Sequence, residues 1–298
     1  MMSHDERVGI FWDPKGFKLD SIGKKSYLRA TDGDTPYVSV PIRMLSIDTP
    51  EVHYPGNQSP STYDDRLKKL ADWIVTGDAP INKDLGEYIL PKISSGTAGT
   101  LQKKQGKEAS EHFKEMVDQS LTKSKGIKRK VFLYASEEHF DSYGRLLAYM
   151  SPQYSSKELA AMPPERRSTF NLRMVESGWA APFLIYPSIP KHADLVRFQI
   201  GARAAYLGNR GIWQDPLTLT GYEFRMCVKL YKITKKKLNG AKMSSAERYG
   251  WISRYCADMT TGKVYYPQDY FKIKPYNRIF IWPNDVSEAV GKMNLIPA

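Results

Sequence analysis

The stretch YLRATDGDTPYVSVPIRMLSIDTPE occupies residues 27–51 and decides the expected fold. Apolar and β-branched residues lie on both sides of the turn sequence Asp32-Gly33-Asp34, so we expect strands over residues 27–31 and 37–47. Asp tolerates left-handed backbone geometry and Gly supplies positive φ, which makes this triplet alone typical of an ordinary turn. The stretch therefore predicts that the chain begins with β-structure.

Farther along the chain the pattern becomes helical. Residues 54–100 carry Gly, Pro, Ser, Thr and Asp at both ends, and Leu67, Leu70, Trp73 and Ile74 stand at helical spacing inside, which predicts an insertion holding one helix. Further helices are expected over 106–121, 170–176 and 193–207, and further strands over 128–135 and 145–150. Short strands first and helices later favour an α+β domain.

The character of the chain changes near residue 215. Residues 224–231 alternate apolar and polar side chains, which predicts a half-buried strand, and two more strands are expected over 264–266 and 278–282. Aromatic residues among lysines suit either a platform for stacking single-stranded bases or the core and rim of a small β-rich module. We therefore divide the chain into a domain over 1–214, which carries the insertion, and a basic, aromatic-rich module over 215–298.

The composition favours a globular chain with a polyanionic partner. Hydrophobic residues make up 41% of the 298 residues, and 44 Lys and Arg stand against 32 Asp and Glu, a formal charge of +12. Basic side chains release counterions when they meet phosphates, although many proteins are basic without binding nucleic acid. The two cysteines, Cys227 and Cys256, are too few for a disulfide framework; they either pair or serve as small core residues.

No targeting or membrane segment is expected. The N-terminal sequence MMSHDERVGIFWDPKG lacks the apolar core of a signal peptide, which favours an intracellular location. The longest apolar stretch, residues 179–186, is too short to span a bilayer, so we expect no membrane partner. The sequence gives no indication of the oligomeric state.

Five charged side chains, spread over four short pieces of sequence, suit phosphodiester chemistry. Asp34 and Asp48 supply hard oxygen ligands of the kind that Ca²⁺ or Mg²⁺ prefers. Glu51, three residues farther on, suits a general base acting on a water. Arg43 and Arg145 offer planar guanidinium groups that match phosphate oxygens. Each piece alone is an ordinary turn, strand or hairpin corner, but together they supply the positioning and charge neutralisation that phosphoryl transfer needs.

In this order, the residues resemble the staphylococcal nuclease family. The resemblance runs from about Tyr27 to Trp213 through LRATDGDTPYVSVPIRMLSIDTPE, QGKEASEHFKEMV, FDSYGRLLAYM, NLRMVESGWAAPF and HADLVRFQIGARAAYLGNRGIW, with 54–100 as an insertion. It implies a five-stranded OB-type β-barrel with three helices, a shape that commonly binds nucleic acid on its open face. It also implies a Ca²⁺-dependent nuclease that acts on DNA or RNA and leaves 3′-phosphate ends.

The resemblance further implies a role for each residue near the metal. Asp34 and Asp48 would bind Ca²⁺ through their side chains, and Thr49 would bind it through its backbone carbonyl. Glu51 would orient or deprotonate the attacking water.

The remaining implied roles concern the substrate. Arg43 and Arg145 would hold the phosphate and stabilise the pentacoordinate transition state. Tyr143 would lie beside the phosphate. Tyr186 stands at the second position of a tyrosine pair with which the family lines its nucleotide pocket, while Leu184 occupies the first position.

The alternative function is a catalytically silent module that binds nucleic acid or protein. Such nuclease-like domains typically lose the metal carboxylates or the arginines. Here all five charged residues are present, which favours the enzyme: Asp34, Arg43, Asp48, Glu51 and Arg145.

The insertion begins three residues after Glu51. An amphipathic helix needs a surface on which to bury its apolar face, so we expect the helix of the insertion to dock on the barrel or on the C-terminal module. It would then form one wall of the substrate cleft and restrict duplex DNA more than single strands. The alternative is an exposed insertion without fixed structure.

Overall fold

The computed structural model describes residues 24–54, 56–123 and 126–298. Its strands are β1 (Tyr27–Ala30), β2 (Pro36–Val38), β3 (Ile42–Met44), β4 (Ile47–Asp48), β5 (Val131–Phe140), β6 (Leu146–Pro152), β7 (Ala181–Pro182), β8 (Leu184–Ile185), β9 (Tyr255–Asp258), β10 (Val264–Tyr265) and β11 (Arg278–Ile281). Its α-helices are α1 (Asp64–Val75), α2 (Lys83–Ile93), α3 (Ala98–Leu121), α4 (Ser156–Ala161), α5 (Phe170–Glu176), α6 (His192–Leu207), α7 (Gly221–Leu238), α8 (Ser245–Tyr249) and α9 (Val286–Met293). Short 3-10 helices include η2 (Pro60–Tyr63) and η6 (Pro267–Lys272).

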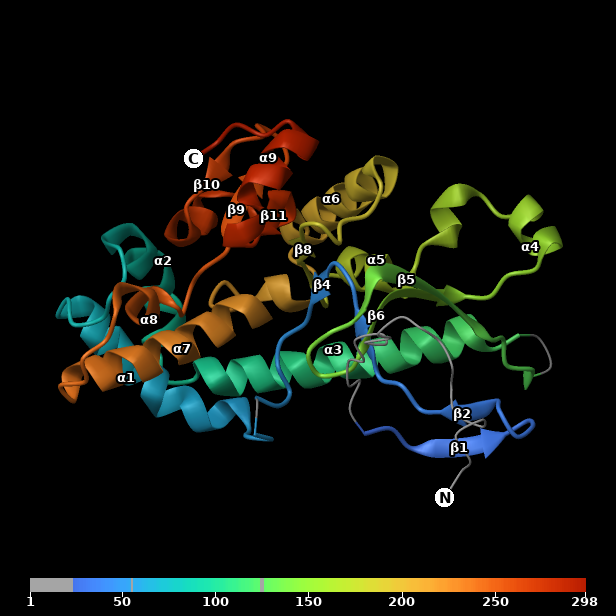
Figure 1. The fold of residues 1–298 in the computed structure, drawn as a ribbon, viewed down its shortest axis with the longest axis horizontal. Helices are drawn as coiled ribbons and strands as arrows, with labels where there is room; N and C mark the ends of the chain where they lie inside the picture. Colours follow the sequence, from blue (N-terminus) through green and yellow to red (C-terminus); the bar gives the residue numbers. More distant parts are fainter. Residues whose placement is uncertain (1–23, 55, 124–125) are drawn as a thin grey trace, which may run out of the picture.

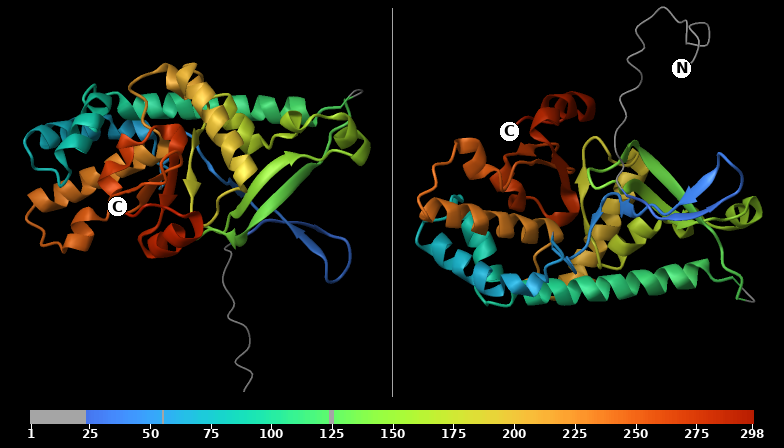
Figure 2. Two further views of the ribbon diagram at one scale, coloured as in Figure 1. Left: turned by 90° about the horizontal axis from the view of Figure 1, so that it is seen from above. Right: turned by 60° about the horizontal axis from the view of Figure 1, so that its bottom comes forward.

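The strands of the nuclease-like part form small separate sheets. β3 pairs in parallel with β6, which pairs in antiparallel with β5, while β4 pairs with β7. The hairpin of β1 and β2 forms a sheet of its own and projects from the body of the molecule (Figures 1 and 2). The mixture of helices and strands confirms the α+β class, but the described strands do not close into a barrel, so the five-stranded barrel stays a prediction.

The strand expected over 37–47 is interrupted in the structure. It is divided into β2, β3 and β4, and Ser46, between β3 and β4, has a positive φ of 63°. A left-handed residue at this position turns the chain sharply. As a result β4 leaves the β3–β6–β5 sheet and pairs with β7 instead.

A hydrophobic cluster beneath β4 fixes that strand in place. It joins Ile47 of β4 to the helices α3, α5 and α6, and its buried members are Ile47, Ala109, Leu172, Met174, Val175, Ala180, Phe198 and Ala202. The long helix α3 runs along one side of the molecule beneath this cluster (Figure 1). The helices expected over 106–121, 170–176 and 193–207 are confirmed, and α3 starts earlier than predicted, at Ala98.

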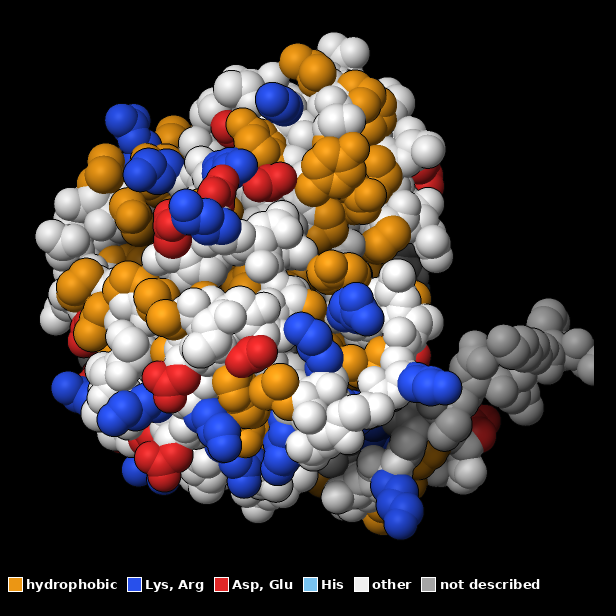
Figure 3. All heavy atoms as spheres, turned by 90° about the vertical axis from the view of Figure 1, so that its left-hand side faces the viewer, with side chains coloured by type: hydrophobic (Ala, Val, Ile, Leu, Met, Phe, Trp, Pro, Cys, Tyr) orange, Lys and Arg blue, Asp and Glu red, His pale blue; other side chains and the backbone are white. Residues whose placement is uncertain are grey.

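The insertion folds together with the C-terminal segment. It holds both α1 and α2, where one helix was expected. Leu67 and Leu70 are fully buried in a cluster that also contains Phe224 of α7, and the ring of Trp73 stacks on that of Tyr231 with a centroid distance of 5.3 Å. The predicted docking of the insertion helix on the C-terminal module is therefore confirmed. On the face that these segments form, basic and acidic side chains are interspersed with apolar ones (Figure 3).

The strand predicted over 224–231 is wrong, because these residues lie within the helix α7. Thr220 caps the helix: its hydroxyl accepts a hydrogen bond from the Glu223 amide, while the Glu223 side chain accepts one from the Thr220 amide. This reciprocal capping box is a strong helix start, and Cys227, on a predicted polar face, is as buried as its apolar neighbours. The C-terminal segment is thus mixed rather than β-rich.

The later strands of this segment are confirmed as β10 and β11. β11 pairs with β9 on one side and, in parallel, with β8 on the other, so one sheet contains strands from both sides of residue 215. The two cysteines, Cys227 and Cys256, are free and buried, which rules out the pairing considered from the sequence. None of the helices in the described ranges has the length and apolarity that crossing a bilayer requires.

Candidate active site

Arg43 and Asp48 meet across the turn that separates β3 from β4. Nη2 of Arg43 donates to Oδ1 of Asp48 at 3.2 Å and to the Ile47 carbonyl at 3.3 Å. The Asp48 side chain is 1% exposed, and Arg43 is 32% exposed. The interrupted strand thus places a buried carboxylate beside a guanidinium that still reaches solvent.

Glu51 joins the same cluster three residues later. Its carboxylate pairs with Arg225 of α7, and Nη2 of Arg225 also donates to both oxygens of Asp48, at 3.1 and 3.0 Å. Burial raises the pKa of Glu51, and the positive charge of Arg225 offsets part of this rise. Burial lowers the pKa of Arg225, but Asp48 and Glu51 outweigh this effect and raise it overall, so Arg225 stays a cation.

The loop before β6 presents Arg145 and Tyr143. Nε of Arg145 donates to Oδ2 of Asp141 at 2.7 Å, and its guanidinium lies 5.2 Å from the centre of the Tyr143 ring. Burial raises the pKa of Asp141, but hydrogen bonds from Arg145 and from the Tyr143 amide outweigh it and lower the pKa overall. Both functional side chains remain accessible, since Arg145 is 39% exposed and Tyr143 is 74% exposed.

The pairing of β3 with β6 brings this loop next to Arg43. In the parallel register, Arg43 lies opposite Leu147, two residues after Arg145. Side chains two residues apart on an extended chain point to the same face. Arg43, in β3, and Arg145, one residue before β6, therefore lie at the same end of the sheet.

Asp34 lies elsewhere. It is in the turn between β1 and β2, where its Oδ1 accepts a hydrogen bond from the Thr35 hydroxyl at 3.0 Å. This turn is exposed and points away from β4 in Figures 1 and 2. The structure thus brings together Arg43, Asp48 and Glu51, with Arg145 in the loop just before the adjacent strand β6, but does not bring Asp34 to them.

Tyr186 is also apart from this cluster. It is 5% exposed and packs in a hydrophobic cluster with Leu184, Ile281 and Ala289. In this position the ring contributes to the core beneath α9 rather than to an open pocket.

Comparison with known proteins now identifies the family. The profile of staphylococcal nuclease homologues matches residues 41–215, more than half of the chain. The chain belongs to the staphylococcal nuclease homologue family. The cluster of Arg43, Asp48, Glu51 and Arg145 lies inside the matched range, whereas Asp34 and Arg225 lie outside it.

A curated relative matches beyond the family domain. The chain is 25% identical over 272 residues to a protein named "Endonuclease YhcR" from Bacillus subtilis (strain 168). The alignment covers 88% of this chain but only 16% of the relative, so the chain spans a small part of that protein's length.

Membership of this family implies a bound Ca²⁺, and the residues expected to hold it are only partly suited to that role. The predicted ligands Asp48 and Thr49 do present neighbouring oxygens, because a Cβ on Gly221 would lie 2.6 Å from both Asp48 Oδ2 and the Thr49 carbonyl oxygen. The start of α7 covers these oxygens, however, and Arg225 binds the Asp48 carboxylate. Among the described residues no group of three or more His, Cys, Asp or Glu could hold a metal ion. This arrangement does not fit a bound Ca²⁺.

Arg225 was not predicted from the sequence. The residue lies in the segment read as a strand, more than 170 positions from the carboxylates it binds. The capping signal of Thr220 and Glu223 would have revealed the helix, but no local pattern shows which side of that helix faces the active site.

Proposed function

We propose that this chain is a nuclease that hydrolyses phosphodiester bonds of DNA or RNA. The observation that carries the proposal is the meeting of Arg43, Asp48 and Glu51 at the β3–β4 turn, inside the region that matches the nuclease family. Arg145 lies at the same end of the sheet, one residue before β6.

In the proposed mechanism the two arginines bind the scissile phosphate. Arg43 in β3 and Arg145, one residue before β6, are both partly exposed and lie at the same end of the sheet. We propose that one phosphate contacts both guanidinium groups. Planar guanidinium groups match phosphate oxygens through paired hydrogen bonds. Their charge also stabilises the extra negative charge of the pentacoordinate transition state.

Glu51 is proposed to accept a proton from the attacking water. As the water oxygen bonds to phosphorus, its proton passes to the Glu51 carboxylate, the bond from phosphorus to the 5′-oxygen breaks, and that oxygen takes a proton from solvent. The products are a 3′-phosphate and a 5′-hydroxyl. A carboxylate with a raised pKa, as burial gives Glu51, is a stronger base than an ordinary one.

Dependence on Ca²⁺ is part of the proposal and rests on the family resemblance. Its ligands would be Asp34, Asp48 and the Thr49 carbonyl, which requires the β1–β2 hairpin to close against the body and Arg225 to leave Asp48. Tyr143, exposed beside Arg145, is proposed to contact the bound strand.

The test is a cleavage assay on end-labelled single-stranded DNA, duplex DNA and RNA, with Ca²⁺ or with a chelator. We expect cleavage with Ca²⁺, none with chelator, and 3′ ends that a polymerase extends only after phosphatase treatment. The double variant Arg43→Ala and Glu51→Gln serves as the inactive control. Binding of nucleic acid without cleavage of any substrate would instead support the silent module. Full cleavage in chelator would remove the Ca²⁺ requirement while leaving the nuclease in place.

A further inference from the structure

Three side chains of the C-terminal segment lie near the candidate active site without a role in the proposed mechanism: Lys229, Arg254 and Trp282. All three lie beyond the range that matches the family. Arg254 precedes β9 and Trp282 follows β11, and these two strands pair in antiparallel, so both side chains stand at the same end of the sheet. The Arg254 guanidinium lies 3.9 Å from the centre of the Trp282 ring. The sheet thus carries a cation stacked on an aromatic ring.

This stack is close to Asp48. The Arg254 guanidinium also lies 5.7 Å from the ring centre of Tyr222, and Tyr222 belongs to the first turn of α7, which covers the Asp48 carboxylate. Lys229 approaches from the same helix, where it lies about one turn beyond Arg225 on the same face. The positive charge of Arg225 is therefore continued by two more cations away from the carboxylates.

Positive charges repel one another in this cluster. Burial lowers the pKa of Lys229, and the charges of Arg254 and Arg225 lower it further. In the part of the chain that the structure describes, neither the Lys229 nor the Arg254 side chain forms an ion pair or a hydrogen bond, and Nε of Arg254 is buried without a partner. Like charges held together in this way destabilise the folded chain, whereas a bound polyanion would neutralise them. The cluster therefore suits backbone phosphates.

Trp282 makes an unpaired strand a better ligand than a duplex. The residue is 42% exposed. An exposed indole beside cations offers a surface on which any base can stack while the cations bind the backbone. The bases of a duplex are stacked on one another and have no free face for this contact.

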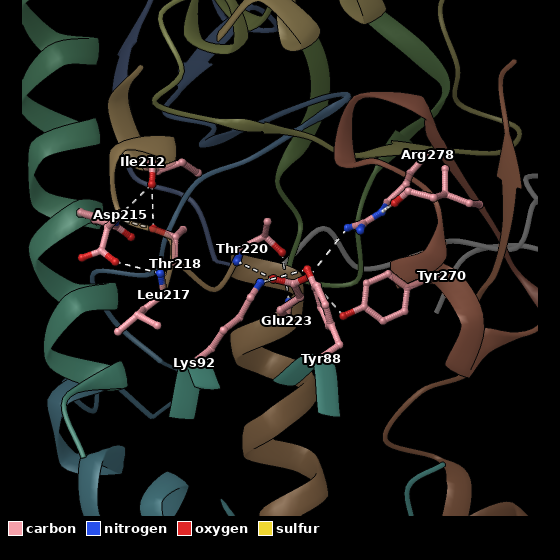
Figure 4. A network of polar contacts seen from close by, with 12 residues as sticks. Tyr88, Lys92, Ile212, Asp215, Leu217, Thr218, Thr220, Glu223, Tyr270 and Arg278 are labelled. Carbon is pink, nitrogen blue, oxygen red and sulfur yellow. Dashed lines mark hydrogen bonds and ion pairs between the residues drawn. The ribbon is translucent and has the colours of Figure 1, made fainter. Parts of the chain in front are cut away.

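A buried network fixes these elements to one another. Glu223 of α7 is fully buried, and its carboxylate accepts hydrogen bonds from Tyr88 and Lys92 of the insertion at 2.8 and 3.2 Å (Figure 4). From the C-terminal side, Tyr270 donates to it at 3.2 Å and Arg278 pairs with it at 3.7 Å. Arg278 begins β11, the strand that ends beside the stacked ring. The helix and the sheet therefore hold their cations in place before any strand binds.

We propose that Lys229, Arg254 and Trp282 form a subsite for single-stranded nucleic acid beside the bond that is cleaved. The two cations bind backbone phosphates, and the indole stacks on an unpaired base. The C-terminal segment thereby gives the nuclease a preference for unpaired strands. This inference rests on the proposed function, in which the strand is cleaved at Arg43 and Glu51.

Binding of fluorescent oligonucleotides to the full chain, measured by anisotropy in chelator, tests the stacking contact. Trp282→Ala should weaken binding of single-stranded DNA about tenfold, because one stacked base is lost. Binding of a duplex of the same length should change less than about twofold, and Trp282→Phe, which keeps a ring, should restore most of the affinity for the single strand. Equal losses for both ligands would contradict the proposal.

The salt dependence of the same binding tests the phosphate contact. For single strands, each phosphate contact contributes about 0.7 to the slope of log affinity against log salt concentration. Lys229→Gln should reduce the slope by about that amount. The matched control is Lys235→Gln, which removes one charge from the last turn of the same helix and should leave the slope unchanged. An unchanged slope for Lys229→Gln would show that this amine does not touch the strand.

A measurement on the wild type does not depend on how the variants fold. Single-stranded DNA that carries iodouracil reacts under ultraviolet light with an aromatic ring on which the base stacks, and mass spectrometry identifies the joined residue. We expect Trp282 to be joined. Cross-links at other residues alone, or no detectable binding of single strands, would overturn the proposal. Cleavage by a protein whose Trp282→Ala variant binds normally would refute the subsite alone, whereas binding of this kind without cleavage would refute only the nuclease.

Discussion

Glu223 and Arg225 lie two residues apart on α7 and tie the helix to different parts of the molecule. Glu223, 1% exposed, pairs with Lys92 of the insertion, while Arg225, 28% exposed, pairs with Asp48 of the nuclease domain. One helix turn therefore connects the buried network of the added segments to the candidate active site. Substitutions that disrupt the network should therefore lower the free energy of unfolding and displace the Arg225 side chain.

The first prediction concerns Glu223→Gln. A buried cation that loses its charged partner typically destabilises a protein by about 3–5 kcal/mol, and this change leaves both Lys92 and Arg278 without one. Urea denaturation at neutral pH should show that the variant's free energy of unfolding is lower by about that amount. Glu87→Gln is the control, because Glu87 and Lys83 form an exposed pair whose loss should cost about 1 kcal/mol or less.

The same network gives the stability a defined pH dependence. Burial alone would raise the pKa of Glu223, but Lys92, Arg278 and the hydrogen bonds to the carboxylate outweigh it and lower the pKa. The stabilisation is therefore present above the pKa that Glu223 has in the unfolded chain. It is lost as the pH falls through the lower pKa that Glu223 has in the folded protein. Between neutral and acidic pH, the wild type should lose more free energy of unfolding than Glu223→Gln. Equal slopes for the two proteins would contradict this assignment.

The second prediction concerns the proposed catalytic residues. Arg43→Ala, Arg145→Ala and Glu51→Gln should each lower kcat by about 10²–10³, the usual effect of removing one preorganised group that stabilises a transition state. Lys83→Ala, an exposed cation on α2, should leave kcat unchanged. Circular dichroism must show that each variant is folded, and a folded variant with less than a tenfold loss would exclude its residue from the mechanism.

The sequence could predict the parts of the site that lie close together along the chain. Only a short strand and a turn separate Arg43, Asp48 and Glu51 along the chain, so their side chains could be expected to lie close together. Arg145 was assigned through the family resemblance, because no local pattern shows that β6 pairs with β3. Arg225 could not be predicted, since its contact depends on how α7 packs on α1 and α2, and that packing is tertiary. The apparent period of two over residues 224–231 led to a strand because a helix buried on most of its surface shows no clear polar face.

The third prediction concerns Asp34 and the hairpin that carries it. The proposed calcium site needs this carboxylate, although the β1–β2 turn projects away from Asp48 in the structure (Figure 1). Exposed apolar side chains on the hairpin, including Tyr27 and Leu28, favour its closure onto the exposed side chains of β5, such as Phe132. Asp34→Asn should therefore weaken Ca²⁺ binding about tenfold or more, the effect of removing one anionic ligand. Asp65→Asn, which removes a carboxylate from the start of α1, is the control. An affinity equal to that of the wild type would show that the hairpin does not join the metal site.

The last prediction concerns the insertion as a wall of the substrate cleft. Removing residues 58–99 is not a clean test, because it would take Leu67 and Leu70 out of the core and Tyr88 and Lys92 away from Glu223. The test therefore keeps the protein intact and compares paired with unpaired DNA substrates. A duplex is wider and stiffer than a single strand, so a wall that starts beside Glu51 should make cleavage of unpaired bubbles faster than cleavage of the same sequence when paired. A photocrosslinker at exposed His53, two residues after Glu51, should label single-stranded DNA, whereas one at exposed Val75, at the end of α1, should not. Equal rates on paired and unpaired DNA, or equal labelling from both positions, would show that the insertion stabilises α7 without bordering the bound strand.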